Sequence, residues 1–310
     1  MRYALILILA SAVLGGCASD GPDRRSAQTG DVAMLAQWLE GDYSNHAQVW
    51  SAMQNDADAP PEYEIDIQRT PPVDGAAALL FRQYEGDNEG ELYREARWLL
   101  SAGESRGEVV QTVQIRQQSD WQTLPGCEVR WRRQDGQFAG ATSGDGCRFS
   151  NRRTGEAVVF QRQWTAGPGG LRLVENRSSA GGAQSESVEL QPMHYYRGWA
   201  GVLPGGPAAK GGQDWQVERN VVLDDAGGVT RLGSGENGEY AVKLERLVWP
   251  NSGIPMLRLS VIEADSGALV AYSWADPGSS RIGINLGWIQ AGLENEKQVG
   301  AARREPHQPE

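Results

Sequence analysis

The chain has 310 residues, with 29 lysines and arginines against 40 aspartates and glutamates, and a net charge of -11 at pH 7. This acidic balance excludes nucleic acid as the main partner, because binding to a phosphate backbone depends on a surplus of cations. Hydrophobic residues make up 40% and charged residues 22%, which excludes a disordered chain and allows a packed core. The 39 glycines, 15 prolines and 11 tryptophans favour many short strands over long helices.

The N-terminus has the pattern of an export signal. An arginine precedes an apolar run over residues 3–14, which is shorter than the roughly 20 helical residues needed to span a bilayer core. Residues 14–17 (LGGC) resemble a bacterial lipobox, in which the cysteine is acylated and becomes the first residue of the mature protein. An ordinary secretory signal with a chance cysteine is the alternative.

This pattern predicts where the protein resides. We expect a lipoprotein signal peptide over residues 1–16, lipidation at Cys17 and a flexible tether over residues 17–30. The mature protein would then be lipid-anchored on the periplasmic face of the cell envelope, with the outer membrane favoured because aspartate does not follow the cysteine.

Cys127 and Cys147 are the two other cysteines of the chain. In an oxidising periplasm two such residues usually pair, and a disulfide that closes a loop of about 20 residues contributes about 3 kcal/mol. Metal binding by this pair is the alternative. The three histidines, at positions 46, 194 and 307, have no ligand spacing with either cysteine, so no metal site is expected.

Residues 31–40 (DVAMLAQWLE) have apolar side chains at helical spacing, with Met34, Leu35, Trp38 and Leu39 on one stripe. Gly41 follows and ends the pattern. The spacing predicts a short amphipathic helix that packs as a lid against a sheet.

From residue 62 the apolar period changes from 3.6 to 2, which predicts strands in sequential hairpins. Asp135-Gly136 is the strongest hairpin signal, because the mirror-image turn needs positive φ at both central positions. Residues 119–124 are expected to form a helical turn and residues 178–187 a polar loop. Nine strands are predicted, with a tenth candidate near residues 193–201; they cover residues 62–69, 76–84, 91–100, 107–117, 127–133, 137–142, 147–151, 156–164 and 171–177.

An all-β meander of this length is expected to close into a barrel, which removes exposed edges and leaves an interior able to hold one small ligand. We therefore predict a barrel over residues 31–202, a linker over 203–213, a smaller β-rich domain over 214–293 and a disordered tail over 294–310. Strands of the second block are predicted over residues 215–223, 239–249, 256–264, 269–274 and 282–289.

The sequence contains no GxSxG, HExxH, phosphate-loop or GxGxxG motif of a common catalytic class. Instead, the predicted strands alternate aromatic residues with arginine and glutamate, as in residues 93–98 (YREARW). In one interpretation the aromatic residues fill a dry core. In the other they line a pocket in which a few polar groups orient a planar ligand.

Three segments resemble one known family. Residues 35–45 (LAQWLEGDYSN), 124–127 (LPGC) and 138–147, which end in GDGC, are similar to segments of the CpcT/CpeT phycobiliprotein chromophore lyases. The similarity covers residues 31–200. It implies a ten-stranded antiparallel, lipocalin-like calyx barrel, and it also implies that Cys127 and Cys147 pair.

The resemblance implies an enzyme, a lyase that attaches a bilin (a linear tetrapyrrole such as phycocyanobilin) to a cysteine of a phycobiliprotein. The acceptor thiol adds across the ethylidene group of the bilin, so the bilin is a bound substrate and no cofactor is required. The family motifs place Arg69, Tyr93, Arg94 and Arg177 in ligand binding, since the planar fork of arginine binds both oxygens of a propionate. The aspartate of the Leu-Asp-Arg-Gly motif is replaced by Asn176, which leaves Glu175 as the candidate catalytic proton donor.

Two other functions are open on the sequence. The first is a non-enzymatic periplasmic lipoprotein whose calyx binds another apolar small molecule, or whose surface docks an envelope partner. The second is a purely structural envelope protein with side chains filling the barrel.

Overall fold

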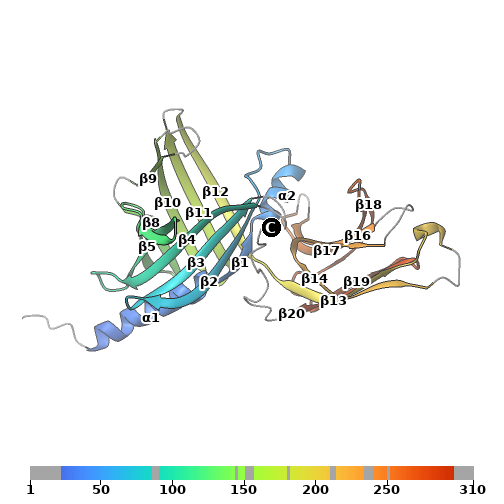
Figure 1. Ribbon diagram of the computed structural model, residues 1–310, viewed down its shortest axis with the longest axis horizontal. Coiled ribbons are helices and arrows are strands. Elements are labelled where there is room, and N and C mark those ends of the chain that lie inside the picture. The colour runs from blue at the N-terminus through green and yellow to red at the C-terminus, as the bar shows by residue number, and fades with distance from the viewer. Residues whose placement is uncertain are drawn as a thin grey trace, which may run out of the picture.

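The computed structural model describes residues 22–85, 91–143, 146–150, 157–179, 182–209, 214–233, 240–249 and 252–296. In these ranges the chain is all-β with two α-helices, α1 (Pro22–Leu39) and α2 (His46–Gln54). Figure 1 shows two units: a barrel, and a pair of sheets that we call the sandwich.

Ten strands within the described residues close into the antiparallel barrel, because β10 pairs with β11. This confirms the predicted ten-stranded, lipocalin-like fold. Two short strands extend the wall: β6 (Asp120–Thr123) pairs with β5, and β9 (Cys147–Ser150) pairs with β10. The barrel strands in order are β11 (Gly170–Ser179), β12 (Gly182–Pro192), β1 (Gly41–Ser44), β2 (Tyr63–Val73), β3 (Ala76–Glu85), β4 (Glu91–Ala102), β5 (Glu108–Gln117), β7 (Val129–Gln134), β8 (Gln137–Thr142) and β10 (Ala157–Gly167).

Helix α1 covers one end of the barrel (Figure 1), where it contacts β3, β4, β5 and β10. Leu35 and Leu39 are fully buried, and the ring of Trp38 meets Phe138 edge-on at 5.5 Å between centroids. The predicted lid helix is therefore present. It begins at Pro22, so residues expected to belong to a flexible tether are helical.

The Asp135-Gly136 turn joins β7 and β8 as predicted, with φ of 49° and 80°. Other local expectations were wrong. Residues 119–124 contain β6 rather than a helical turn, and Trp121 of this strand lies under the guanidinium groups of Arg97 and Arg116 at 4.9 and 5.1 Å. Residues 178–187, expected to form a loop, belong largely to β11 and β12.

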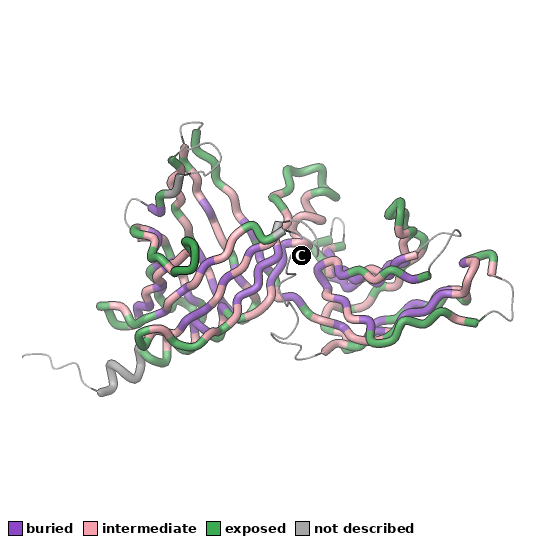
Figure 2. The backbone as a smooth tube through the Cα atoms, viewed as in Figure 1, coloured by how far each residue is buried: buried purple, intermediate pink, exposed green. Residues whose placement is uncertain are grey.

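The sandwich consists of two four-stranded sheets among the described residues. Its core is apolar, with Leu244, Leu257, Ile289 and Leu293 almost fully buried between the sheets. Figure 2 shows that both units contain buried residues along their strands. One sheet has the order β14 (Gln216–Asp224), β13 (Tyr195–Val202), β20 (Ile289–Glu296), β19 (Arg281–Asn285); the other has β15 (Ala226–Leu232), β16 (Tyr240–Val248), β17 (Pro255–Glu263), β18 (Leu269–Ala275).

The unit boundary differs from the prediction. The strand expected near residues 193–201 as the tenth of the barrel is β13, which pairs with β14 and β20 of the sandwich. The units are therefore joined at Met193 and His194, and the predicted 203–213 linker, which contains the short 3-10 helix Gly206–Ala208, connects two strands of the sandwich. The single strand predicted over residues 282–289 is split between β19 and β20.

Candidate functional site

The barrel encloses a cavity of about 90 Å³. Its wall is largely aromatic and aliphatic: the rings of Phe81 and Trp98 stack at 4.5 Å, and Trp98 meets Trp164 edge-on at 5.8 Å. Gln111 also lines the cavity and accepts a hydrogen bond of 2.8 Å from the indole N–H of Trp131. Alternation along each strand puts these side chains inside and their neighbours outside.

A charged cluster lies inside the barrel at the end opposite α1. Arg162 on β10 donates a hydrogen bond of 2.6 Å from Nε to Glu175 on β11, its partner in the strand register. Arg177, two residues further along β11 and on the same face, lies 3.2 Å from the other oxygen of Glu175. Both guanidinium groups lie over the ring of Phe160, at 5.1 and 5.2 Å. Arg94 on β4 lines the cavity with Arg162.

The cluster has more positive than negative charge, and burial destabilises the charged form of each side chain. Burial and the positive charge of Arg94 lower the pKa of Arg162 to about 10, although Glu175 opposes the shift. Burial alone would raise the pKa of Glu175, but the charges of Arg162 and Arg94, together with hydrogen bonds from Arg162 and Arg177, lower it. Glu175 is therefore ionised at neutral pH, and its carboxylate orients the arginines.

Three buried polar atoms of this region have no hydrogen-bond partner among the described residues: Nη2 of Arg162, Nε of Arg177 and Oε1 of Glu186. Glu186 on β12 faces Glu175 in the strand register. Burial and the negative charge of Glu175 raise the pKa of Glu186. Of these three residues Arg162 lines the cavity. An unsatisfied buried donor is expensive, so the free Nη2 of Arg162 points to a ligand that would satisfy it.

The structure brings together three of the residues that the sequence singled out, namely Arg94, Glu175 and Arg177. Two others lie elsewhere. Tyr93 is half exposed and faces away from the cavity, with the guanidinium of Arg94 5.5 Å from its ring. Arg69 lies at the α1 end of β2, where it is 45% exposed and forms an ion pair of 3.2 Å with Glu40.

Cys127 and Cys147 are joined by a disulfide, and Cys127 lines the cavity. Cys17 lies outside the described residues, so its lipidation stays a prediction. Asn176, the residue at the position of the family aspartate, lies between Glu175 and Arg177 on the alternate face of β11 and does not line the cavity.

Sequence reasoning missed Arg162 and Glu186. Arg162 could have been found from its strand, because Phe160, Arg162 and Trp164 follow one another at every second position and therefore share a face. Glu186 could not, since the polar stretch that contains it was predicted to be a loop.

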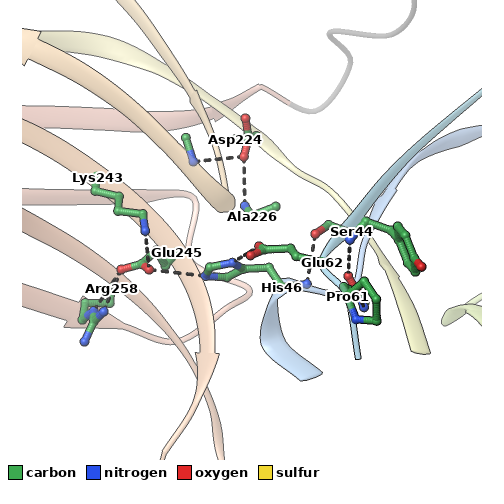
Figure 3. Close-up of polar contacts among 12 residues, drawn as sticks. Ser44, His46, Pro61, Glu62, Asp224, Ala226, Lys243, Glu245 and Arg258 are labelled. Carbon is green, nitrogen blue, oxygen red and sulfur yellow. Dashed lines mark hydrogen bonds and ion pairs between the residues drawn. The ribbon is translucent and has the colours of Figure 1, made fainter. Parts of the chain in front are cut away.

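A second charged cluster joins the two units (Figure 3). His46, the first residue of α2, lies between Glu62 on the barrel side and Glu245 on β16, with Nε2 3.3 Å from the Glu245 carboxylate. Lys243 and Arg258 contact the same carboxylate at 3.1 and 2.7 Å. Glu245 is only 4% exposed, so three cations surround one buried anion and one of them comes from the other unit.

These contacts change the pKa values of both partners. Burial opposes the charge on His46, but the carboxylates of Glu245 and Glu62 outweigh it and raise its pKa to about 9. Burial likewise opposes the charge on Glu245, but His46, Lys243 and Arg258 hold its pKa well below the usual range. At neutral pH the contact is therefore between an imidazolium and a carboxylate.

Within the described ranges, no group of three or more histidine, cysteine, aspartate or glutamate side chains is arranged to hold a metal ion. The helices of the described part are also too short or too polar to cross a membrane.

Comparison with known proteins finds a distant relative among chromophore lyases. The chain is 27% identical over 220 residues to Chromophore lyase CpcT/CpeT 2 of Synechococcus sp. (strain JA-3-3Ab), with 62% of this chain and 98% of the relative covered. Among solved structures, the SeMet CRL Protein of Arabidopsis covers 54% of this chain and 99% of that chain, at 13% identity and a TM-score of 0.41. No family model matches the chain. The chain is thus a distant homologue of a CpcT/CpeT chromophore lyase over 62% of its length.

Proposed function

We propose that the barrel binds a linear tetrapyrrole and presents it to a cysteine of an acceptor protein, as a bilin lyase of the CpcT/CpeT type. One observation carries this proposal: the buried Arg162 lines the cavity, in a cluster with Arg94 and Arg177, and its Nη2 has no hydrogen-bond partner in the described part of the chain. The homology to a chromophore lyase supports it.

The charge of the cluster suits the ligand. Three arginines against Glu175 and Glu186 leave a positive excess in a low-dielectric interior, where an anion is bound more strongly than in water. A bilin has two propionates, and each arginine can bind both oxygens of one carboxylate. The aromatic wall of Phe81, Trp98 and Trp164 suits the planar pyrrole rings.

The cavity is smaller than the ligand requires. Small-molecule pockets have volumes of roughly 300–1,000 Å³, against about 90 Å³ here. A tetrapyrrole would therefore enter through the end opposite α1, and either widen the barrel or extend beyond its rim. Rotation of the side chains that line the cavity would provide part of the space.

The chemical step is an addition that needs no oxidant. The acceptor thiol forms a carbon–sulfur bond at the ethylidene group, the π electrons of the exocyclic double bond take up a proton, and the sulfur loses one. A protonated carboxyl beside the pyrrole nitrogens would make the ethylidene group more electrophilic. Glu186, whose pKa is raised, suits this role better than Glu175, whose pKa is lowered.

The test is a titration of the purified full chain with phycocyanobilin, followed by visible absorption. We expect a red-shifted, sharpened band, and roughly tenfold weaker binding in Arg94→Gln, which removes one charge but leaves the Arg162–Glu175 pair intact. Arg69→Gln is the matched control, because it removes an arginine at the opposite end. An unchanged spectrum, or equal losses in the two variants, would contradict the proposal.

The cavity volume also favours a second candidate, the non-enzymatic carrier. An apolar molecule with one carboxylate, small enough for about 90 Å³ with modest widening, would satisfy Arg162 without opening the barrel. In this second proposal the carrier is a lipoprotein: Cys17 is lipidated and the protein faces the periplasm. Native mass spectrometry of protein extracted from its own membranes tests both: we expect a diacylglyceryl-cysteine N-terminus, and a stoichiometric non-bilin carboxylate would favour the carrier.

A further inference from the structure

An open groove of about 1070 Å³ runs across the outer face of the sheet β14-β13-β20-β19. The opposite face of this sheet carries Tyr196, Ile289 and Leu293 into the sandwich core. The groove therefore lies on the solvent side of the sandwich and is separate from the barrel cavity. No part of the function proposed above uses it.

The floor of the groove is made by residues without side chains next to one aromatic ring. Gly283 on β19 pairs with Gly292 on β20, and Gly292 pairs with Trp199 on β13. A Cβ on Gly292 would lie 3.4 Å from Nε1 of Trp199, so the indole lies beside this glycine, and it is 42% exposed. The result is a flat surface with one accessible ring at its centre.

The backbone fixes the position of this ring. A β-bulge separates Gly198 from Trp199, and a Cβ on Gly198 would lie 1.8 Å from the carbonyl oxygen of Gly292. No other residue fits at position 198 without moving β20. The bulge bends β13 at this point and directs Trp199 into the groove.

Arginines stand on three of the four strands around this floor. Arg219 is opposite Trp199 on β14, Arg197 lies on β13 and Arg281 lies on β19. Arg197 forms an ion pair with Glu296, whereas Arg219 and Arg281 form none with any residue that the structure describes. Glu294 also lines the groove and faces Arg281 in the strand register, so the lining has three arginines against two glutamates. In a chain of net charge -11, this small positive excess is complementary to an anionic ligand.

The spacing of these groups limits the ligand class. Arg219 and Arg281 are three strand spacings apart, which is roughly 14 Å, so one ligand that reaches both carries separated negative groups. A flat floor with one indole lacks the side-chain pockets that a peptide needs. It does suit a sugar ring, whose C–H face packs on an indole while its hydroxyls reach a planar polar group such as Asn220.

We propose that this groove of the sandwich binds an acidic oligosaccharide, with a ring packed on Trp199 and carboxylates held by Arg219 and Arg281. The bidentate fork of arginine matches a uronate carboxylate. The bilin proposal and this one stand on different residues, so either can fail alone.

The test is isothermal titration of the full chain with a galacturonate tetramer, alongside a neutral glucose tetramer of the same length. We expect binding of the acidic tetramer only, weakened at least tenfold in Trp199→Ala and in the double variant Arg219→Gln/Arg281→Gln. Trp274→Ala is the matched control, since Trp274 is 64% exposed on the other sheet, and we expect its affinity to be unchanged.

The proposal would be overturned by no heat with millimolar acidic tetramer, by equal affinity for the neutral tetramer, or by an equal loss in Trp274→Ala. Polyglutamate peptide serves as a further probe. Binding of this peptide as tightly as the galacturonate tetramer would make the groove a general anion site and would overturn the assignment to a sugar. Circular dichroism of every variant separates loss of binding from loss of fold.

Discussion

In the barrel, charged side chains point inward at a cavity, whereas in the sandwich the cluster between the two sheets is apolar and the buried Glu245 lies on the alternate face of β16, toward the barrel unit. Arg162 and Glu175 are nearly buried between β10 and β11, while the corresponding interior positions of β16 and β17 are Leu244, Leu257 and Leu259. Both units nevertheless have the same period of two. Alternation therefore identifies a strand but does not say which face binds a ligand.

The largest loss in the free energy of unfolding should come from replacing Arg162, the arginine inside the barrel. Arg162→Met leaves Glu175 buried with less compensation, which typically costs about 3–5 kcal/mol; we expect the lower end because Arg177 still contacts this carboxylate. Arg219→Met, on the outer face of the sandwich, should change the free energy of unfolding by less than about 0.5 kcal/mol. Urea denaturation measures both, and equal losses would remove the contrast between the units.

The next largest loss of stability should follow removal of the disulfide, and it should be confined to the barrel. The disulfide joins Cys127 and Cys147 in the barrel, and the sandwich contains no cysteine. Replacing both cysteines by serine should destabilise the barrel by about 3 kcal/mol. Hydrogen exchange read by mass spectrometry is the measurement: we expect faster exchange in barrel peptides and unchanged exchange in β16 and β17. Equal acceleration in both units would show that they unfold together.

The smallest change in the free energy of unfolding is expected at the junction, where His46 of the barrel unit contacts Glu245 of the sandwich. The pKa of His46 is raised from 6.5 to about 9, so its stabilisation is complete below pH 6.5 and is lost as the pH rises to 9. We expect the native protein to lose roughly 1–3 kcal/mol over this interval and His46→Gln to show a flatter profile. Urea unfolding at pH 6 and pH 9.5 measures the slope.

His194→Gln is the control for this prediction, because His194 lies at the same junction but is 45% exposed and pairs with Asp225 rather than Glu245. Its slope should match that of the unaltered chain. A His46→Gln profile as steep as the native one would assign the pH dependence to other groups.

Much of the fold was predictable, because turn chemistry and alternation are local. Asp135-Gly136 fixed a hairpin, and the lid helix followed from four apolar residues at helical spacing. The polar segment of β12 was missed since exposed residues occupy consecutive positions there and leave no alternation. The unit boundary was missed because β13 and the barrel strands have the same pattern, and only long-range pairing separates them.

The candidate site was less predictable than the fold. Arg94, Glu175 and Arg177 came from the family resemblance, and the strand register brings them together. Arg69, which the resemblance placed in ligand binding, does not line the cavity, because β2 continues to Val73 and Arg69 falls near the α1 end, beside Glu40. Whether an arginine on a barrel strand reaches the cavity depends on its height along the strand, which composition and period do not encode.

The first and last strands of the sandwich, β13 and β20, pair with each other along eight residues, from Tyr195 opposite Glu296 to Val202 opposite Ile289. Entry to this module and exit from β20 are consequently at one place, beside the final strand of the barrel. Because its two ends are neighbours, the sandwich is suited to transfer as a unit. It could be deleted from this chain, or inserted after the last strand of an unrelated protein, without a long connection to span the distance between its ends.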